Sequence, residues 1–179
     1  VTNKYSKALY VGGVAGYTTG MVSMSKADGN ITCTNEYTTY AGGLVGRSMK
    51  VLNSYSVGDV SVNVTKGYVL YIGGIAGEQN DRITECYYSF GDLFGQSAGT
   101  VYSGGISGFA KAKIDNSYSS YSYIVTDMSK SGSEAYLGGI TGYNNVELYN
   151  VYSMNFIDGK ADGENKTLYI GGLAGYNNK

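Results

Sequence analysis

A phrase of seven residues recurs six times in this chain, at intervals of 30 to 34 residues. Each copy reads tyrosine, any residue, two glycines, an aliphatic residue, a small residue and glycine. The copies are Tyr10–Gly16, Tyr40–Gly46, Tyr71–Gly77, Tyr102–Gly108, Tyr136–Gly142 and Tyr169–Gly175. A fixed period of this size predicts a repeat architecture, in which each unit buries its apolar face against its neighbours. We therefore expect one stack over residues 1–179, a single domain that is a segment of a longer protein.

A second phrase follows each of the first five glycine phrases after about a dozen residues and predicts another strand. It contains a tyrosine in four units and a serine in five. The tyrosines are Tyr55, Tyr88, Tyr118 and Tyr152, and the serines are Ser25, Ser56, Ser89, Ser119 and Ser153. A third segment alternates apolar and polar residues, as in Val60–Val64, which is typical of a half-buried strand. The composition favours strands and turns throughout.

Three short strands in about 31 residues predict one coil of an all-β, right-handed parallel β-helix. Five to six such coils would stack at about 4.8 Å each. An interior column is expected from one aliphatic residue per coil: Val14, Leu44, Ile75, Ile106, Ile140 and Leu173. Stacked hairpins remain an alternative, because periodicity does not give strand direction.

The recurring glycines are expected to serve backbone geometry, because glycine weakens a strand interior. The pair either bends the strand at a corner or leaves room for a neighbouring group. A positive φ is expected at the last glycine of each phrase: Gly16, Gly46, Gly77, Gly108, Gly142 and Gly175. A phosphate-binding loop would occur once and run into a helix.

These residues resemble the GLUG motif, a short bacterial repeat with the core Gly-Gly-Leu-Val-Gly, often followed by Asn-Cys-Tyr. Residues 42–46 match the core completely, and Cys86-Tyr87 with Asn53, Asn116 and Asn150 echoes the second part. The resemblance implies a β-helix in a large secreted or surface-attached bacterial protein. Such proteins include adhesin-like proteins and non-catalytic parts of IgA-cleaving metalloproteases. It implies no particular activity.

Charge and composition argue against several functions. The chain has 13 basic and 14 acidic residues, which gives no footprint for nucleic acid. No apolar run approaches the roughly 18 residues that span a membrane, so no membrane insertion is expected. Histidine is absent, which removes the His-Glu-x-x-His zinc site of a metalloprotease. Cys33 and Cys86 occupy different repeat positions and are expected to be separate thiols.

Carboxylates offer weak candidates for a metal site. Asp59 and Asp92 are expected to lie about one coil apart, where they could bind calcium, or simply form a repeated Gly-Asp turn. Asp158, Asp162 and Glu164 flank a glycine-rich loop that resembles a calcium loop, but Lys160 stands where an oxygen ligand belongs. We expect no metal, no cofactor and no catalytic residue.

The tyrosines of the glycine phrase are the candidate ligand-binding residues: Tyr10, Tyr40, Tyr71, Tyr102, Tyr136 and Tyr169. An exposed column could contact sugar rings or a partner protein, whereas a covered column would only stack between coils.

The first hypothesis is a non-enzymatic structural or adhesive segment, a rigid stalk or multivalent rod, secreted or at the cell surface. Its partner would be a host or cell-surface glycan or protein. The alternatives are a carbohydrate-binding or carbohydrate-active module, and a filament subunit that self-associates end to end.

Overall fold

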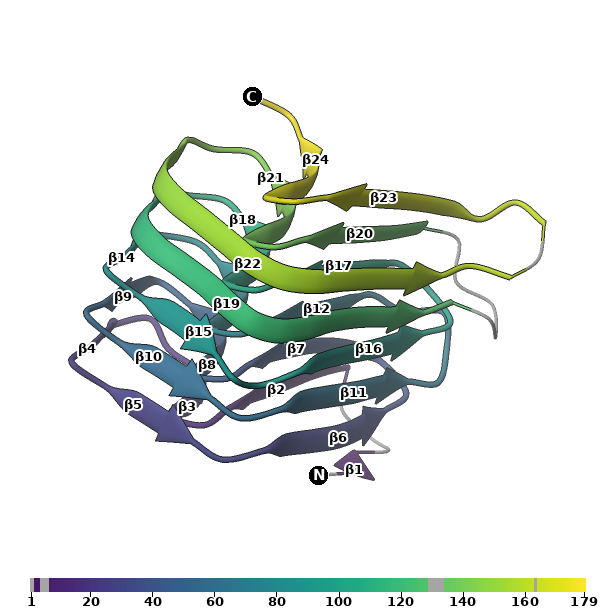
Figure 1. Cartoon of the computed structure of the whole chain (residues 1–179). Coiled ribbons are helices and arrows are strands. Elements are labelled where there is room, and N and C mark those ends of the chain that lie inside the picture. Colours follow the sequence, from purple (N-terminus) through teal and green to yellow (C-terminus); the bar gives the residue numbers. More distant parts are fainter. Residues whose placement is uncertain (1, 4–6, 129–133, 163) are drawn as a thin grey trace.

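The computed structural model describes residues 2–3, 7–128, 134–162 and 164–179, which form strands and turns but no helix. Each strand in this part pairs in parallel with the equivalent strand one repeat before or after it. Gly42, for example, lies beside Gly73, which lies beside Gly104. The chain is therefore a parallel β-solenoid (Figure 1). Stacked hairpins are excluded, because they would pair antiparallel.

Three sheets form the faces of the solenoid. The tyrosine sheet contains β2 (Ala8–Gly12), β7 (Thr38–Gly42), β12 (Leu70–Gly73), β17 (Val101–Gly104), β20 (Glu134–Gly138) and β23 (Thr167–Gly171). The second sheet contains β3 (Ala15–Tyr17), β8 (Val45–Ser48), β13 (Ala76–Gln79), β18 (Ser107–Ala110), β21 (Thr141–Asn144) and β24 (Ala174–Asn177). The front sheet contains β1 (Thr2–Asn3), β4 (Met21–Ser23), β5 (Lys26–Asp28), β6 (Ile31–Asn35), β9 (Lys50–Leu52), β10 (Tyr55–Val57), β11 (Val60–Val64), β14 (Ile83–Thr84), β15 (Tyr87–Ser89), β16 (Leu93–Ser97), β19 (Ile114–Asp127) and β22 (Leu148–Lys160).

The coil is right-handed, as the sequence predicts. In Figure 1 the near strands β6, β11 and β16 run to the right, the far strands β7 and β12 return to the left, and the chain climbs from the N-terminus to the C-terminus. Three faces per coil match the three predicted strands, but the front face is divided further. It holds three short strands in the early coils, which merge into the long strands β19 and β22 in the later ones.

The predicted aliphatic column forms the centre of the core. Leu44, Ile75, Ile106 and Ile140 are fully buried. Val14 and Leu173 are 46% and 42% exposed, because they lie on the first and last coils and are covered from one side only. The core therefore depends on stacking between coils rather than on any one coil.

The glycine pair leaves room for a neighbouring strand. A Cβ at Gly105 would lie 2.3 Å from the Gly139 carbonyl oxygen and 2.3 Å from Ser119 Oγ on the front sheet. The predicted positive φ at the last glycine of each phrase is wrong, because Gly58 is the one glycine with positive φ among the described residues. At Gly46, a Cβ would instead lie 2.6 Å from the Tyr40 carbonyl oxygen, so close approach excludes a side chain.

Candidate functional site

The tyrosines of the glycine phrase form one continuous ladder on the outer face of the tyrosine sheet. Leu70 and Ile72 are buried on either side of Tyr71, which places the tyrosine on the opposite face. Successive ring centroids are 4.9, 4.7, 5.2, 5.0 and 4.7 Å apart, with nearly parallel planes. The ladder runs Tyr10, Tyr40, Tyr71, Tyr102, Tyr136, Tyr169. Each ring between the two ends therefore has a neighbour on both faces.

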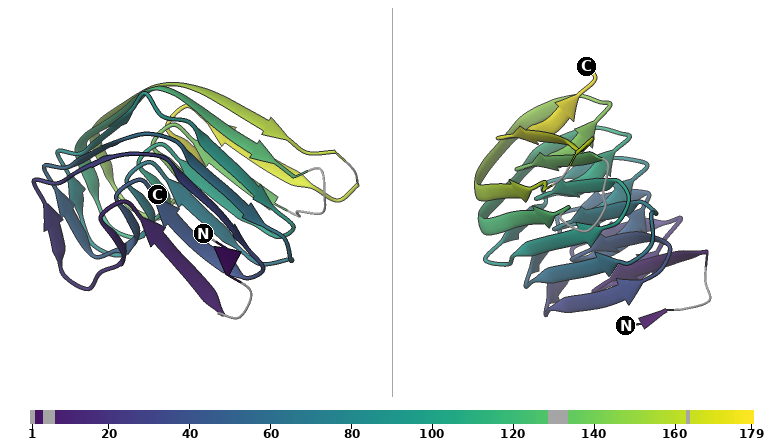
Figure 2. Two further views of the ribbon diagram at one scale, coloured as in Figure 1. Left: turned by 90° about the horizontal axis from the view of Figure 1, so that it is seen from below. Right: turned by 90° about the vertical axis from the view of Figure 1, so that its right-hand side faces the viewer.

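A second column, on the second sheet, packs against this ladder. It contains Tyr17, Arg47, Glu78, Phe109, Tyr143 and Tyr176. Phe109 meets the edges of Tyr71 and Tyr102 at 6.1 and 5.3 Å between centroids. The two columns, together called the aromatic corner, line the inside angle of the bent coil, which is visible in the left view of Figure 2. Burial raises the pKa of Tyr71 far above its ordinary value, and Tyr40 and Glu78 add to the effect.

A charged cluster interrupts the aromatic corner at its middle coils. Glu78 binds Arg47 Nε at 2.7 Å and Lys111 Nζ at 3.0 Å, and its side chain is only 4% exposed. The Arg47 guanidinium also lies over the rings of Tyr17 and Tyr40. Burial raises the pKa of Tyr40, and the Glu78 carboxylate raises it further. The cluster holds three successive coils together and presents no free carboxylate for catalysis.

The tyrosines of the second phrase form a second ladder, but their alignment predicted from the sequence is wrong at one unit. Tyr87, not Tyr88, lies between Tyr55 and Tyr118, at 4.6 and 5.1 Å between centroids, and Tyr152 continues the stack at 4.8 Å. Tyr88 points into the core, where its hydroxyl donates to the Gly58 carbonyl at 2.9 Å. Burial raises the pKa of Tyr88 strongly. The prediction failed because the Tyr-Tyr pair offered two alignments.

The serines of the second phrase also align differently from the sequence prediction, for the same reason. Ser56 pairs with Tyr88, which pairs with Ser119, which pairs with Ser153, so Ser89 lies outside this column. In the first coil the position belongs to Ala27, not Ser25. The column consists of small inward side chains that face the glycine pair, except where Tyr88 fills the space.

Asp59 and Asp92 lie one coil apart on the front sheet, as expected. The backbone N–H of Asp59 donates to Asn30 Oδ1, and that of Asp92 donates to Asp59 Oδ1. The backbone N–H of Tyr123 in turn donates to Asp92 Oδ1, and each of the three distances is 2.9 Å. This column supports the interpretation as repeated turn chemistry. Within the described residues, no three His, Cys, Asp or Glu side chains gather around a metal position.

The glycine-rich loop after β22 holds the other acidic candidates. Asp158 is exposed on β22, and Glu164 is exposed in the loop. Lys160 Nζ binds Asp162 Oδ2 at 3.1 Å, and the Lys166 ammonium donates to the backbone carbonyls of Asp162 and Met128. The lysines occupy the space where the calcium-loop resemblance would require a cation.

Both cysteines are buried, free thiols in separate columns, as predicted. Cys33 lies beside Val62, whereas the backbone N–H of Cys86 donates to Ser117 Oγ. Burial raises the pKa of each thiol to about 11. Neither has the low pKa of a reactive cysteine.

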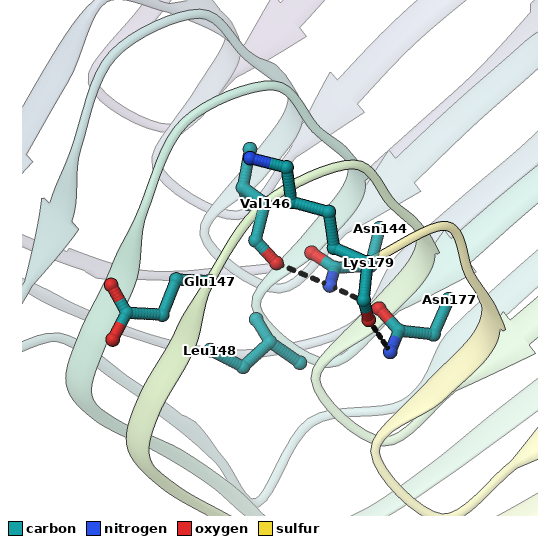
Figure 3. Close-up of a pocket in the computed structure, with 6 residues that line it drawn as sticks. All are labelled: Asn144, Val146, Glu147, Leu148, Asn177 and Lys179. Carbon is teal, nitrogen blue, oxygen red and sulfur yellow. Dashed lines mark hydrogen bonds between the residues drawn. The ribbon is translucent and has the colours of Figure 1, made fainter.

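Two hollows among the described residues lie at the ends of the stack. One, of about 380 Å³, is lined by Asn144, Val146, Glu147, Leu148, Asn177 and Lys179 (Figure 3). The Asn144 Nδ2 group is already engaged, since it donates to the Val146 carbonyl and to Asn177 Oδ1, both at 2.7 Å. The other, of about 280 Å³, lies against β5 in the first coil. Neither gathers groups suited to catalysis.

Sequence reasoning missed a cluster of exposed aromatic residues. It lies where β15 meets β16 and where β19 and β22 bend, and the backbone of the front sheet forms a convex ridge there (Figure 2, left). We call it the ridge patch and define it as Phe90, Phe94, Tyr121, Tyr123 and Phe156. Phe90 stacks on Tyr121 and Tyr123 on Phe156, each pair at 5.2 Å between centroids. One signal in the sequence could have revealed the irregularity that produces this patch. The spacing from the tyrosine of the second ladder to the following aspartate is one residue longer at Tyr87–Asp92 than at Tyr55–Asp59.

Comparison with known proteins bears on the repeat itself. Residues 7–32, which form most of the first coil, match the family model described as the GLUG motif. The chain carries a GLUG motif. Later coils repeat the tyrosine and the glycine pair of this GLUG segment in register. No curated protein and no solved structure matches the chain. The described residues include no helix long and apolar enough to cross a membrane.

Proposed function

We propose that this GLUG-repeat solenoid is a non-enzymatic segment of a secreted or cell-surface bacterial protein, serving as a rigid stalk that presents binding surfaces at fixed spacing. The observation that carries the proposal is the parallel pairing of successive coils in all three sheets, which continues through the one register shift between β19 and β22. Each coil is joined to the next by backbone hydrogen bonds on every face, so bending would break many of them together.

The ladders support rigidity in preference to sugar binding along their length. A sugar ring packs on an open aromatic face, but most ladder rings are covered on both faces by their neighbours. A carbohydrate-active module would need carboxylates that converge on one groove. Asp59 and Asp92 instead accept hydrogen bonds from the backbone of the next coil. These contacts favour the stalk.

Rigidity is tested with spin labels on one outward column of the front sheet. Register connects Thr34 to Asn63, Gln96, Asp127 and Lys160 in successive coils. Labels on Thr34→Cys and Lys160→Cys should give a single narrow distance near 19 Å plus the label arms, because four rises of about 4.8 Å separate these backbones. The buried native thiols should stay unlabelled. A broad distribution, with the coils flexing independently, would contradict the stalk.

Surface location and adhesion need separate tests. An antibody against this segment should label intact cells of the source bacterium if the segment is exposed there. Beads coated with the chain should adhere to a glycan array or to host-cell protein if the stalk is itself adhesive. Adhesion lost on substitution of one exposed face would identify that face, and labelling restricted to lysed cells would refute the surface location.

A further inference from the structure

The ridge patch is built on an unfavourable backbone conformation. Phe90 and Tyr121 have φ of +59° and +56°, in the left-handed region that bulky side chains rarely occupy. The coil before them makes the same bend with Gly58, at a φ of +123°. The coil after them uses one residue fewer, and the register between β19 and β22 shifts at this point. Glycine or asparagine would suit the bend better, so the backbone does not account for the aromatic residues.

Core packing does not account for them either. Phe90 is 73% exposed, Phe156 71% and Tyr121 63%. Phenylalanine, unlike tyrosine, has no hydroxyl group that could bond to water, so exposure of its ring is not compensated. Exposed apolar clusters commonly mark interaction sites. Unlike the ladder rings between the ladder ends, Phe90 and Phe156 each stack on one aromatic ring only among the described residues, which leaves the other ring face open.

Carboxylates without a cationic partner border the patch. Asp59 and Asp92 lie in one outward column, which Tyr123 and Phe156 continue in the next coils. Asp158 lies at the end of a second outward column, which contains Phe94. All three aspartates are exposed, and none takes part in the ion pairs between described residues. Asp59 and Asp92 each use one oxygen for the turn, so the second oxygen can receive another donor.

We infer that the ridge patch binds an arginine- or lysine-bearing segment of a partner protein. A guanidinium group can lie over an open ring face while it donates to a carboxylate, and both contacts favour a cation. A neutral sugar would use the rings but would gain nothing from the negative charge. This inference rests on the proposed stalk and specifies the partner chemistry of one of its faces.

The test is fluorescence anisotropy with the full chain and a short labelled peptide that alternates arginine with serine. A peptide with citrulline in place of arginine is the matched probe, because it keeps the shape and removes the charge. Binding of the arginine peptide should be clearly tighter and should weaken with added salt. Equal binding of the two peptides, or no binding, would overturn the inference.

Variants then locate the site. Phe90→Asn and Tyr121→Asn remove a ring and suit the left-handed backbone, so the chain should still fold, and each should weaken binding about fivefold. Asp92→Asn keeps the oxygen that the Tyr123 N–H requires, loses the charge, and should weaken binding roughly threefold. Asp81→Asn, in the β13–β14 loop, is the matched control and should leave binding unchanged.

A glycan gives a different result. A labelled neutral oligosaccharide could bind the parent chain and fail to bind the Phe90→Asn variant. If its binding were also unchanged by Asp92→Asn and by salt, the patch would be a sugar site, and the inference of a cationic partner would be overturned. The spin-label distances do not depend on the ridge patch. Loss of this inference therefore leaves the stalk untouched, and a flexible solenoid would refute the stalk even if the peptide bound.

Discussion

Gly105 and Gly172 occupy the same position of the repeat but have different surroundings. A Cβ at Gly105 would collide with the Gly139 carbonyl and Ser119 Oγ, whereas nothing lies within 4 Å of a Cβ at Gly172. We expect Gly105→Ala to lower the free energy of unfolding by about 1–3 kcal/mol, the usual cost of overpacking. Gly172→Ala should stay within about 0.5 kcal/mol of the parent chain. Urea denaturation measures the free energy of unfolding of both variants. Equal losses would show that glycine is required for its backbone conformation and not for the close approach of neighbouring atoms.

The buried thiols predict a loss of stability at alkaline pH. Burial raises the pKa of Cys33 and Cys86 to about 11 from an unfolded value of 9. Between these pH values the unfolded chain holds fewer protons than the folded chain, so the free energy of unfolding falls as the pH rises. Each thiol contributes about 2–3 kcal/mol to the fall by pH 11.

Serine provides the matched control for this titration. Ser54 and Ser117 occupy the Cys86 position in the adjacent coils, so Cys86→Ser should fit the turn. The variant should lose stability less steeply than the parent between pH 9 and 11, although tyrosine ionisation steepens both curves at the upper end. Identical slopes in urea titrations at stepped pH would contradict the assignment of this loss to Cys86.

At the scale of the element, the charged cluster joins neighbouring strands of the second sheet. Glu78 on β13 holds Arg47 on β8 and Lys111 just after β18. Glu78→Ala leaves both cations without their partner, and we expect a loss of about 1–3 kcal/mol, below the value for a fully buried pair because both cations reach water. Glu147→Ala removes an exposed partner of Lys113 and should cost less than about 0.5 kcal/mol. Similar losses in calorimetry would mean that burial of Glu78 adds nothing.

The elements also show what the sequence could predict. The recurring residues predicted the coil and the interior aliphatic column, because equal positions stack directly over one another. Periodicity left the strand direction open, and the parallel pairing of equivalent strands decides it. The alignment of Tyr88 with the other tyrosines failed although the sequence contained a signal against it. The spacing from Ile83 to Tyr87 equals the spacing from Val51 to Tyr55, and Ile83 pairs with Val51. At this position, the spacing to a core residue predicts the alignment of the tyrosine better than the match of residue type does.

The ridge patch illustrates a different limit. A search for repetition finds what every coil shares, but the patch arises from an additional residue in two coils, followed by a register shift. The positive φ of Phe90 and Tyr121 was not predictable either, since bulky residues normally avoid that conformation. The candidate binding surface therefore lies where the sequence departs from its own period.

At the scale of the whole molecule, a solenoid with interchangeable coils should tolerate the loss of one complete coil. Gly73 pairs with Gly104, so deletion of residues 74–104 joins Gly73 to Gly105 and restores the glycine pair. The remaining coils keep their columns, because nearest-neighbour contacts dominate such arrays. Small-angle X-ray scattering should show a particle about 4.8 Å shorter, and unfolding should stay cooperative.

Deletion of residues 74–89 is the control, because half a coil removes fewer residues but ruins the register. It joins Gly73 to Phe90, moves the front-sheet segment into the place of the second sheet, and separates the core columns of the flanking coils. We expect this variant to unfold or aggregate while the larger deletion folds. If the complete-coil deletion fails as badly as the half-coil deletion, the coils are not interchangeable, and stability depends on specific partners such as Tyr88 with Gly58 and Glu78 with Arg47.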